Sequence, residues 1–273
     1  MHVVIHTASP PHGKPRDVYF KVNVEGTRNV INACVERKVK KLVYTSSLSV
    51  VYYGQNLVNV DETEPYCTTH MDPYNETKQM AEIAVLKANG NGGLLTCAIR
   101  PTGIFGPRDG QASFELMKAA KDGHWRLQVG ENNHLYDWTY VDNVAHIHVL
   151  AALKMEKDNG IAGEAFFVTN DQPIQFWDFS KYLYNGLGYR QTQYIYLPMF
   201  LAFIIADIMD FLHSLFNIPM PLSRFKLLMI HCNVYFNISK AKRLLGYQPI
   251  VTFQDGMDRT VEYWKTQGYG NQI

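Results

Sequence analysis

Two hydrophobic patterns alternate along the first part of the chain. The apolar run VVIHTA (3–8) is typical of a buried parallel strand, although so short a run does not by itself distinguish a strand from a helix segment. From about Asp17 to Arg37, apolar residues recur at the spacing of a helix. KLVYTSS (41–47) then predicts a second buried strand. The predicted order is strand, helix, strand.

A third pair of elements repeats this order. Asp72 is suited to cap a helix that has Pro73 at its first position and that ends near Asn89–Gly90. LLTCAIRP (94–101) predicts the next strand, and its proline ends it. Because strands and helices alternate, the sequence predicts a doubly wound α/β fold, in which helices cover both faces of a parallel sheet.

The pattern changes after Gly106–Pro107, where loops are longer and apolar runs shorter. YVDNVAHIHVLAALKM (140–155) predicts a helix that returns to the first part of the chain, with Val144, Ile147, His148 and Ala151 on one face. We therefore predict two parts without a sharp boundary. The first is a Rossmann-type domain of residues 1–110, joined by 137–170, and the second is a smaller, mainly helical lobe of residues 111–136 and 171–273.

One segment of that lobe, YIYLPMFLAFIIADIMDFLHSLF (194–216), is strongly apolar. Its unbroken apolar run has ten residues, whereas a helix that spans a bilayer needs about 20, so we expect no crossing. On a helix, Asp207, Asp210 and His213 share one face, and the pattern places Phe203, Ile208 and Leu212 opposite. This favours a helix at a membrane interface or over a lipid-like ligand; an ordinary buried helix is the alternative.

Composition narrows the possible partners. With 47% hydrophobic residues the chain has enough apolar material for a large core, and its 26 basic and 25 acidic residues give a net charge of +1 without a long block of one sign. We expect no nucleic-acid partner. The four cysteines lack CxxC spacing and follow no signal sequence, which predicts reduced thiols, with Cys97 in the core. His146 and His148 would point to different faces of a helix, so we predict no metal site.

Chemically useful residues follow the predicted strands. In an open parallel sheet, ligands bind beyond the carboxyl ends of the strands, and HTASP (6–10), TSS (45–47) and RPTGIFGP (100–107) lie at these ends. Tyr74 and Lys78 stand four apart at the start of the intervening helix, on one face of it. A nearby ammonium would lower the pKa of the phenol towards neutrality.

These residues predict a proton-transfer site. The hydroxyl of Ser47, or of Ser46, could converge with the Tyr74 phenol and the Lys78 ammonium on one substrate oxygen. Such a set suits oxidation of an alcohol, and because no side chain accepts a hydride, it implies a nicotinamide cofactor. The alternative is that both serines only bond to backbone at a strand end.

The motifs resemble those of a known family. NVEGTRNV (23–30), YTSS (44–47), Tyr74-x-x-x-Lys78 and RPTGIFGP resemble the extended short-chain dehydrogenase/reductase family, and nearly the whole chain is similar to its 3β-hydroxysteroid dehydrogenases. The resemblance is strongest to the branch that decarboxylates sterol 4α-carboxylates, as shown by HTASPPHG, KLVYTSSLSVVYYGQ, MDPYNETK, GENNHLYDWTYVDNVAHIHVLAA and AKRLLGYQP.

The resemblance implies a role for each motif residue. Tyr74 would be the catalytic acid/base, Lys78 would lower its pKa and hold the nicotinamide ribose, and Ser47 would orient the substrate oxygen. The cofactor would be NAD or NADP. The other implied cofactor-binding residues are Ala8, Ser9, Asn23, Pro101, Thr102, Gly103 and Ile104.

The implied activity is oxidation of a 3β-hydroxy-4α-carboxysterol to the 3-ketone with loss of carbon dioxide, in the synthesis of ergosterol or another sterol. The resemblance further implies a sterol substrate, peripheral membrane contact through residues 194–216, and a place on the cytosolic face of the endoplasmic reticulum. Association with other enzymes of sterol C4 demethylation is also implied. Alternatives are a reductase of another small carbonyl compound and a non-catalytic protein that binds a sterol or a partner.

The sequence also departs from the family's pattern. The glycine-rich GxxGxxG fingerprint is absent, and MHVVIHTASP matches the family's fourth strand, so we expect a dinucleotide-binding domain that lacks its first strands. Three consequences are expected: the choice between NAD and NADP is not readable, this chain alone binds cofactor poorly, and an apolar strand is left at a sheet edge, open to pairing or aggregation. Gly26, inside a helix, predicts a close approach to a cofactor or to a neighbouring strand.

Overall fold

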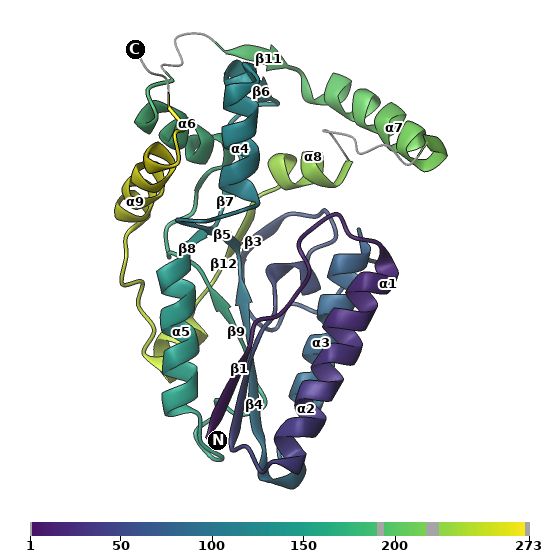
Figure 1. The fold of residues 1–273 in the computed structure, drawn as a ribbon, viewed down its shortest axis with the longest axis vertical. Helices are drawn as coiled ribbons and strands as arrows, with labels where there is room; N and C mark the ends of the chain where they lie inside the picture. The colour runs from purple at the N-terminus through teal and green to yellow at the C-terminus, as the bar shows by residue number, and fades with distance from the viewer. Residues whose placement is uncertain (1, 190–193, 217–223, 271–273) are drawn as a thin grey trace.

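A computed structural model describes residues 2–189, 194–216 and 224–270. Its main sheet is parallel throughout, in the order β1-β2-β4-β9 (Figure 1). These strands are β1 (Val3–His6), β2 (Lys41–Thr45), β4 (Leu95–Pro101) and β9 (Ala165–Val168). The three strands predicted in the first part of the chain are therefore neighbours in one sheet.

Helices cover both faces of this sheet (Figure 1). On one face lie α1 (Arg16–Tyr19), η1 (Phe20–Glu25), α2 (Gly26–Glu36) and α3 (Pro73–Lys87), and on the other lies α5 (Val141–Lys154). The first face buries a cluster that includes Leu42, Tyr44, Ala81 and Val85. The predicted doubly wound α/β fold is confirmed, and the four residues predicted on one face of α5 are all buried.

The start of α3 follows from its sequence. Asp72 has extended backbone and its carboxylate accepts a hydrogen bond from the Asn75 amide at 2.8 Å, while Pro73 occupies the first turn. This satisfies an amide that the helix itself leaves unpaired, so the predicted cap is confirmed.

The first predicted helix differs in detail from the expectation. It contains a π-helical segment, η1, between α1 and α2, which the apolar spacing does not reveal. A Cβ built on Gly26 would meet only the Lys21 carbonyl oxygen, at 3.6 Å, among the described residues. The predicted close approach of Gly26 to a neighbouring strand is therefore wrong, because the nearest backbone is that of its own helix.

The remaining elements lie outside the main sheet and its helical layers. A mixed sheet has the order β10-β7-β12-β3, and β11-β6 and β5-β8 are parallel pairs. The strands are β3 (Leu57–Val60), β5 (Gly103–Phe105), β6 (Leu127–Val129), β7 (Leu135–Tyr136), β8 (Trp138–Tyr140), β10 (Ile174–Gln175), β11 (Ile195–Leu197) and β12 (Val234–Phe236). The helices are η2 (Leu48–Val50), η3 (Asn91–Gly93), α4 (Ala112–Lys121), η4 (His124–Arg126), α6 (Phe176–Gly186), α7 (Met199–Phe216), α8 (Arg224–His231), η5 (Ala241–Leu245) and α9 (Phe253–Thr266).

A continuous apolar core joins the two parts. It runs from Ile147 and Phe166 at the main sheet to Trp138 and Phe179, whose rings stack with their centroids 4.0 Å apart. Cys97, fully buried, belongs to this core, as predicted, and all four cysteines are free. The division of the chain into two lobes stays a prediction.

Gly103 shows how tightly this core is packed. A Cβ there would lie 2.7 Å from Cε3 of Trp138 and 2.9 Å from Cε1 of Tyr136. We expect Gly103→Ala to lower the free energy of unfolding by about 1–3 kcal/mol through overpacking, measured by urea denaturation. Gly110→Ala is the matched control, because a Cβ there meets nothing within 4 Å. Equal unfolding midpoints for the two variants would refute this account of Gly103.

The apolar segment 194–216 forms β11 and α7, and α7 extends away from the body of the protein (Figure 1). The helix is not an ordinary buried one, because a row of large apolar side chains is 36–65% exposed: Phe200, Leu201, Ile204, Ile205, Ile208 and Phe211. Among the described residues, no helix is long and apolar enough to cross a membrane.

The predicted faces of α7 need one correction. Phe203 lies one turn before Asp207, and both contact Arg224: the guanidinium carbon is 5.2 Å from the Phe203 ring centroid and Nη1 is 3.0 Å from the Asp207 carboxylate. Phe203 therefore shares the face of the acidic residues instead of opposing it. Ile208, which was predicted on the face opposite the acidic residues, is 55% exposed. The side chain of His213 lies outside the described residues.

Strand β1 lies at one edge of the main sheet, paired with β2. Its Ile5 side chain is 44% exposed. An apolar edge strand of this kind is open to pairing with another strand, and the predicted pairing or aggregation stays a prediction.

Candidate active site

The predicted catalytic residues meet at the carboxyl end of the main sheet. His6 ends β1, Thr45 ends β2, and Tyr74 and Lys78 lie in the first turns of α3. This is the edge at which open α/β sheets bind ligands.

Ser47 and Tyr74 contact each other as predicted. The Ser47 hydroxyl lies close enough to the Tyr74 phenol to lower its pKa. The same hydroxyl accepts a hydrogen bond from the Ser49 amide at 3.2 Å, so Ser47 also bonds to backbone. Ser46, the alternative, is 4% exposed, and its hydroxyl has no hydrogen-bond partner among the described residues. The structure thus brings together Ser47, not Ser46, with the phenol.

The Tyr74 phenol does not have the lowered pKa that the sequence predicts. Desolvation raises its pKa from 10.0 to about 12, the Ser47 hydrogen bond opposes this shift, and the charge of Asp72 adds to it. The predicted shift towards neutrality is therefore wrong for this structure. The physical reason is that desolvation outweighs the hydrogen bond, while Lys78 is held at a different group.

Lys78 is buried, with 2% of its surface exposed, beneath the end of β2. Its Nζ donates to the Thr45 carbonyl and lies 4.5 Å from the centroid of the Tyr44 ring. Burial lowers the pKa of Lys78 from 10.5 to about 7, and the Glu82 carboxylate opposes this shift. A pKa this far below that of a free lysine is unusual.

A buried ion pair lies one turn below Lys78 on α3. Nη2 of Arg100 is 2.7 Å from the Glu82 carboxylate, and the Tyr66 hydroxyl donates to the same carboxylate at 2.7 Å. The two charged side chains are at most 4% exposed. Glu82 is four residues beyond Lys78, so Tyr74, Lys78 and Glu82 follow one another along one face of the helix.

Asn23 occupies the π-helical segment and faces α3. Its Nδ2 donates to the Thr77 hydroxyl at 3.1 Å, whereas its Oδ1 is buried without a partner among the described residues. Buried polar atoms are usually paired, and π-helical segments occur frequently at functional sites. This atom is therefore a free acceptor beside the turn that carries Tyr74 and Lys78.

The other predicted cofactor residues surround the same edge with less definite contacts. Ala8 is exposed, and the Ser9 hydroxyl donates to the Pro10 carbonyl at 3.5 Å. Thr102 is buried and its hydroxyl bonds to that of Thr139 at 2.5 Å, so this side chain is engaged in the interior. Pro101 is buried, whereas Ile104 is 39% exposed. Gly103 is explained by packing, as described above.

Two aromatic neighbours of Tyr74 were missed by the sequence prediction. The centroid of the His12 ring is 4.2 Å from that of Tyr74, and the Tyr19 ring meets Tyr74 edge-on at 5.8 Å. His12 lies in the loop that follows β1. Because ligands bind beyond the carboxyl ends of parallel strands, this loop could have been considered from the sequence. Tyr19, 2% exposed, has the pattern of a core residue and gives no functional signal.

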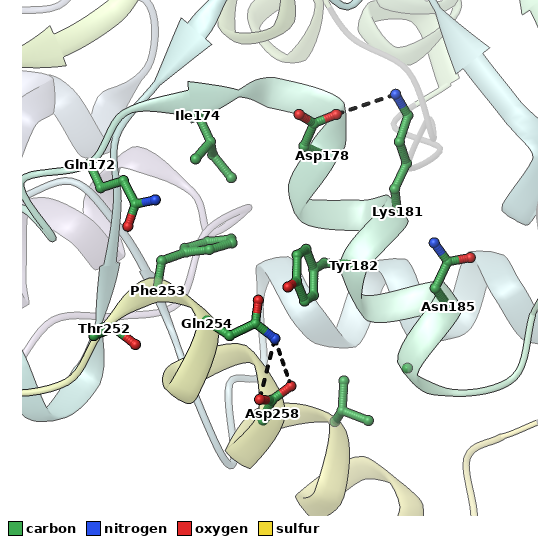
Figure 2. A pocket seen from close by; sticks show the side chains of 12 residues that line it. Gln172, Ile174, Asp178, Lys181, Tyr182, Asn185, Thr252, Phe253, Gln254 and Asp258 are labelled. Atoms are coloured by element: carbon green, nitrogen blue, oxygen red, sulfur yellow. Dashed lines mark hydrogen bonds and ion pairs between the residues drawn. The ribbon is translucent and has the colours of Figure 1, made fainter.

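A separate cavity lies between α6 and α9 (Figure 2). Its volume is about 510 Å³, and none of the predicted site residues is among those that line it. Figure 2 shows Phe253 and Tyr182 facing it, with the pairs Asp178–Lys181 and Gln254–Asp258 at its wall. Because these polar groups already satisfy one another, we assign no ligand to this cavity.

Comparison with known proteins extends these observations. A profile described as the 3-beta hydroxysteroid dehydrogenase/isomerase family matches residues 1–199. The chain is 44% identical to the protein named sterol-4-alpha-carboxylate 3-dehydrogenase, decarboxylating, of Candida albicans, over 96% of this chain and 76% of that relative. The protein of the same name from Saccharomyces cerevisiae is 42% identical, over 98% of this chain and 77% of the relative.

A solved structure shows the same fold. UDP-glucuronic acid 4-epimerase from Bacillus cereus in complex with NAD matches with a TM-score of 0.71 at 24% identity, over 98% of this chain and 75% of that chain. At this level of identity the likeness concerns the fold alone.

The parallel sheet, its two helical layers and this structural likeness define a doubly wound α/β protein with a Rossmann-type fold. Within that class, the chain belongs to the 3-beta hydroxysteroid dehydrogenase/isomerase family. The predictions of family and fold class are confirmed, and the relatives are named as the kind of oxidoreductase that the motifs predicted.

Proposed function

We propose that this protein oxidises the 3β-hydroxyl of a 4α-carboxysterol to a ketone, with a nicotinamide as hydride acceptor, and that carbon dioxide is then lost, as a step of ergosterol or other sterol synthesis. The observation that carries the proposal is the approach of the Ser47 hydroxyl to the Tyr74 phenol at the carboxyl end of the sheet, one helical turn from Lys78. The names of the relatives support the choice of substrate.

In the proposed reaction each residue acts on a stated atom. Tyr74, as phenolate, takes the proton of the 3-hydroxyl, and the Ser47 hydroxyl donates a hydrogen bond to the same oxygen. Lys78 supplies a positive charge beneath them when protonated. Oxidation places a ketone β to the carboxylate, and a β-keto acid loses carbon dioxide without a further catalytic residue.

The described residues fit a nicotinamide cofactor. The unpaired Oδ1 of Asn23 and the buried ammonium of Lys78 offer an acceptor and a donor beside the phenol. We propose that Tyr74 and Lys78 contact the cofactor from α3, with Asn23 opposite, and that Ala8, Ser9 and residues 101–104 border it. When bound, the nicotinamide would accept the hydride from the sterol. We leave the choice between NAD and NADP open.

The test is turnover of a 4α-carboxysterol. The purified chain, mixed with the sterol and with NAD or NADP in turn, is expected to produce reduced nicotinamide and carbon dioxide in equal amounts. If the protein does not turn over the sterol but reduces a small carbonyl compound, the sterol assignment is wrong.

We further propose that the part of the chain that contains the main sheet, residues 1–110 and 137–170, holds the dinucleotide. Residues 111–136 and 171–273 would then hold the sterol.

A sterol dissolves in membranes, so an enzyme that rests on a membrane gains access to it. We propose peripheral attachment through residues 194–216 at the cytosolic face of the endoplasmic reticulum, beside other enzymes of sterol C4 demethylation. The support is the row of exposed apolar side chains on α7. The acidic Asp207 of this helix does not belong to the row, because it pairs with Arg224.

We expect the double variant Phe200→Asp, Ile208→Asp to lose at least about tenfold in binding to phosphatidylcholine vesicles, measured by co-sedimentation. The reason is that burial of each large apolar side chain contributes about 1.5–3 kcal/mol. The matched control is Leu153→Asp, Ile250→Asp, which alters two side chains that are 71% and 60% exposed on other elements. Equal binding by the two double variants would rule out α7 as the membrane contact.

A further inference from the structure

The loop between β1 and α1 is held against the Tyr74 phenol. The Tyr19 hydroxyl donates to the Pro11 carbonyl at 2.8 Å and accepts from the Lys14 amide at 3.2 Å. Because Tyr19 also meets Tyr74 edge-on, these bonds fix the loop beside the site. His12 lies between Pro11 and Lys14, and so its position is set from both sides.

His12 brings a polar, reachable group to the phenol. Its ring is tilted by 52° against that of Tyr74 at a centroid distance of 4.2 Å, and the residue is exposed. An imidazole donates a hydrogen bond from a ring nitrogen in its neutral form and from both when protonated. Desolvation lowers the pKa of His12, and the charge of the Asp72 carboxylate opposes this shift.

The chemistry of the proposed substrate makes this position informative. The carboxylate sits on the ring carbon adjacent to the one that bears the reacting hydroxyl. A group that binds the carboxylate must therefore lie immediately beside the group that binds the 3-oxygen, which is Tyr74. A site built for this substrate needs a donor at that place, since a buried carboxylate without a partner is costly.

Two other cations of this region already have partners or assigned roles. Nζ of Lys78 donates to the Thr45 carbonyl, and we assign its remaining hydrogens to the cofactor. The Arg16 guanidinium is 2.6 Å from the Glu76 carboxylate. His12 is in ring contact with the phenol and has no hydrogen bond through its ring among those that the described residues show.

We propose that His12 recognises the 4α-carboxylate of the substrate, donating an imidazole N–H to it while Tyr74 holds the neighbouring 3-oxygen. This inference rests on the proposed function. After oxidation, the bond between C4 and the carboxyl carbon breaks and its electron pair forms the enolate of the 3-ketone, which is then protonated at C4. The product carbon dioxide is neutral, so His12 has no charge left to bind and the gas departs.

The test compares two sterols that differ at one group, a 4α-carboxysterol and its 4α-methyl counterpart, both with a 3β-hydroxyl. In His12→Ala, the ratio of kcat/KM for the carboxysterol to that for the methylsterol is expected to fall about 10- to 150-fold, as for loss of a hydrogen bond to a charged group. His12→Gln, which keeps a donor, is expected to restore part of the ratio. His124→Ala, at an exposed histidine of η4, is the matched control.

A binding measurement makes the result independent of turnover. Equilibrium binding of both sterols, followed by intrinsic fluorescence, is expected to show that His12→Ala weakens binding of the carboxysterol selectively. An unchanged preference, or an equal loss for both sterols, overturns the role of His12. If the unaltered protein binds the carboxysterol selectively but oxidises neither sterol, the proposed function fails while the role of His12 stands.

Discussion

Replacing Tyr74 with phenylalanine is expected to lower kcat for oxidation of the 4α-carboxysterol by about 10²- to 10⁴-fold. In the proposed reaction the phenol exchanges the proton, and the Ser47 hydroxyl lies close to it at the carboxyl end of the sheet. Phenylalanine fills the same space between His12 and Tyr19, so the ring contacts remain and the loss is one of chemistry. The measurement is steady-state production of reduced nicotinamide, together with thermal unfolding of both proteins.

The pH dependence adds a second readout to this experiment. Because desolvation raises the pKa of Tyr74 to about 12, the phenolate is scarce at pH 7 and its amount grows as pH rises towards that value. We expect oxidation to speed up from pH 7 to pH 9 in the unaltered protein and Tyr74→Phe to abolish this rise. Tyr53→Phe, at a tyrosine that is 51% exposed, is the control. A Tyr74→Phe rate within tenfold of the unaltered rate would exclude the phenol as the acid/base.

The parts of this fold that the sequence predicted depend on local signals. Asp72 and Pro73 set the start of α3 by themselves, because a cap needs only its own side chain and the next three amides. Short apolar runs between helical periods likewise predicted β1, β2 and β4. The candidate site followed from the same signals, since the ends of parallel strands meet at one edge and bring Ser47 to Tyr74.

The parts that could not be predicted depend on contacts between distant segments. The pKa of Tyr74 is set by desolvation, which requires the loop around His12 to be in place. Thr102 was expected to face a cofactor, yet it bonds to Thr139, a partner 37 residues away. On α7, the pattern gave the apolar character, but the packing of Ala202 and Ala206 against Leu227 on the following helix decides which face turns inward.

We predict that the buried Lys78 ammonium lowers the free energy of unfolding of the protein. Its pKa in the folded protein is about 7, against 10.5 for an unperturbed lysine. Between these values the unfolded chain binds more protons than the folded one, so stability rises with pH across this window. Below pH 7 both states are protonated and the folded protein carries the full penalty of a buried charge. Above 10.5 both are neutral and the penalty is absent.

Lys78→Met is therefore expected to raise the free energy of unfolding at pH 6 by a few kcal/mol, on the order set by a shift of this size, and to gain progressively less as pH increases towards 10. Methionine fills the space of the stem beside Tyr44, while the hydrogen bond to Thr45 is lost and reduces the gain. Urea denaturation across this pH range gives the measurement, with Lys87→Met, at an exposed lysine of the same helix, as the control. The contrary outcome is that Lys78→Met lowers the free energy of unfolding by the same amount at pH 6 and at pH 10. This would show that the contacts of the ammonium stabilise the protein by more than its burial destabilises it. Loss of oxidation together with a gain in stability would instead mark Lys78 as retained for the reaction, because a buried charge that weakens the fold has no structural reason to be there.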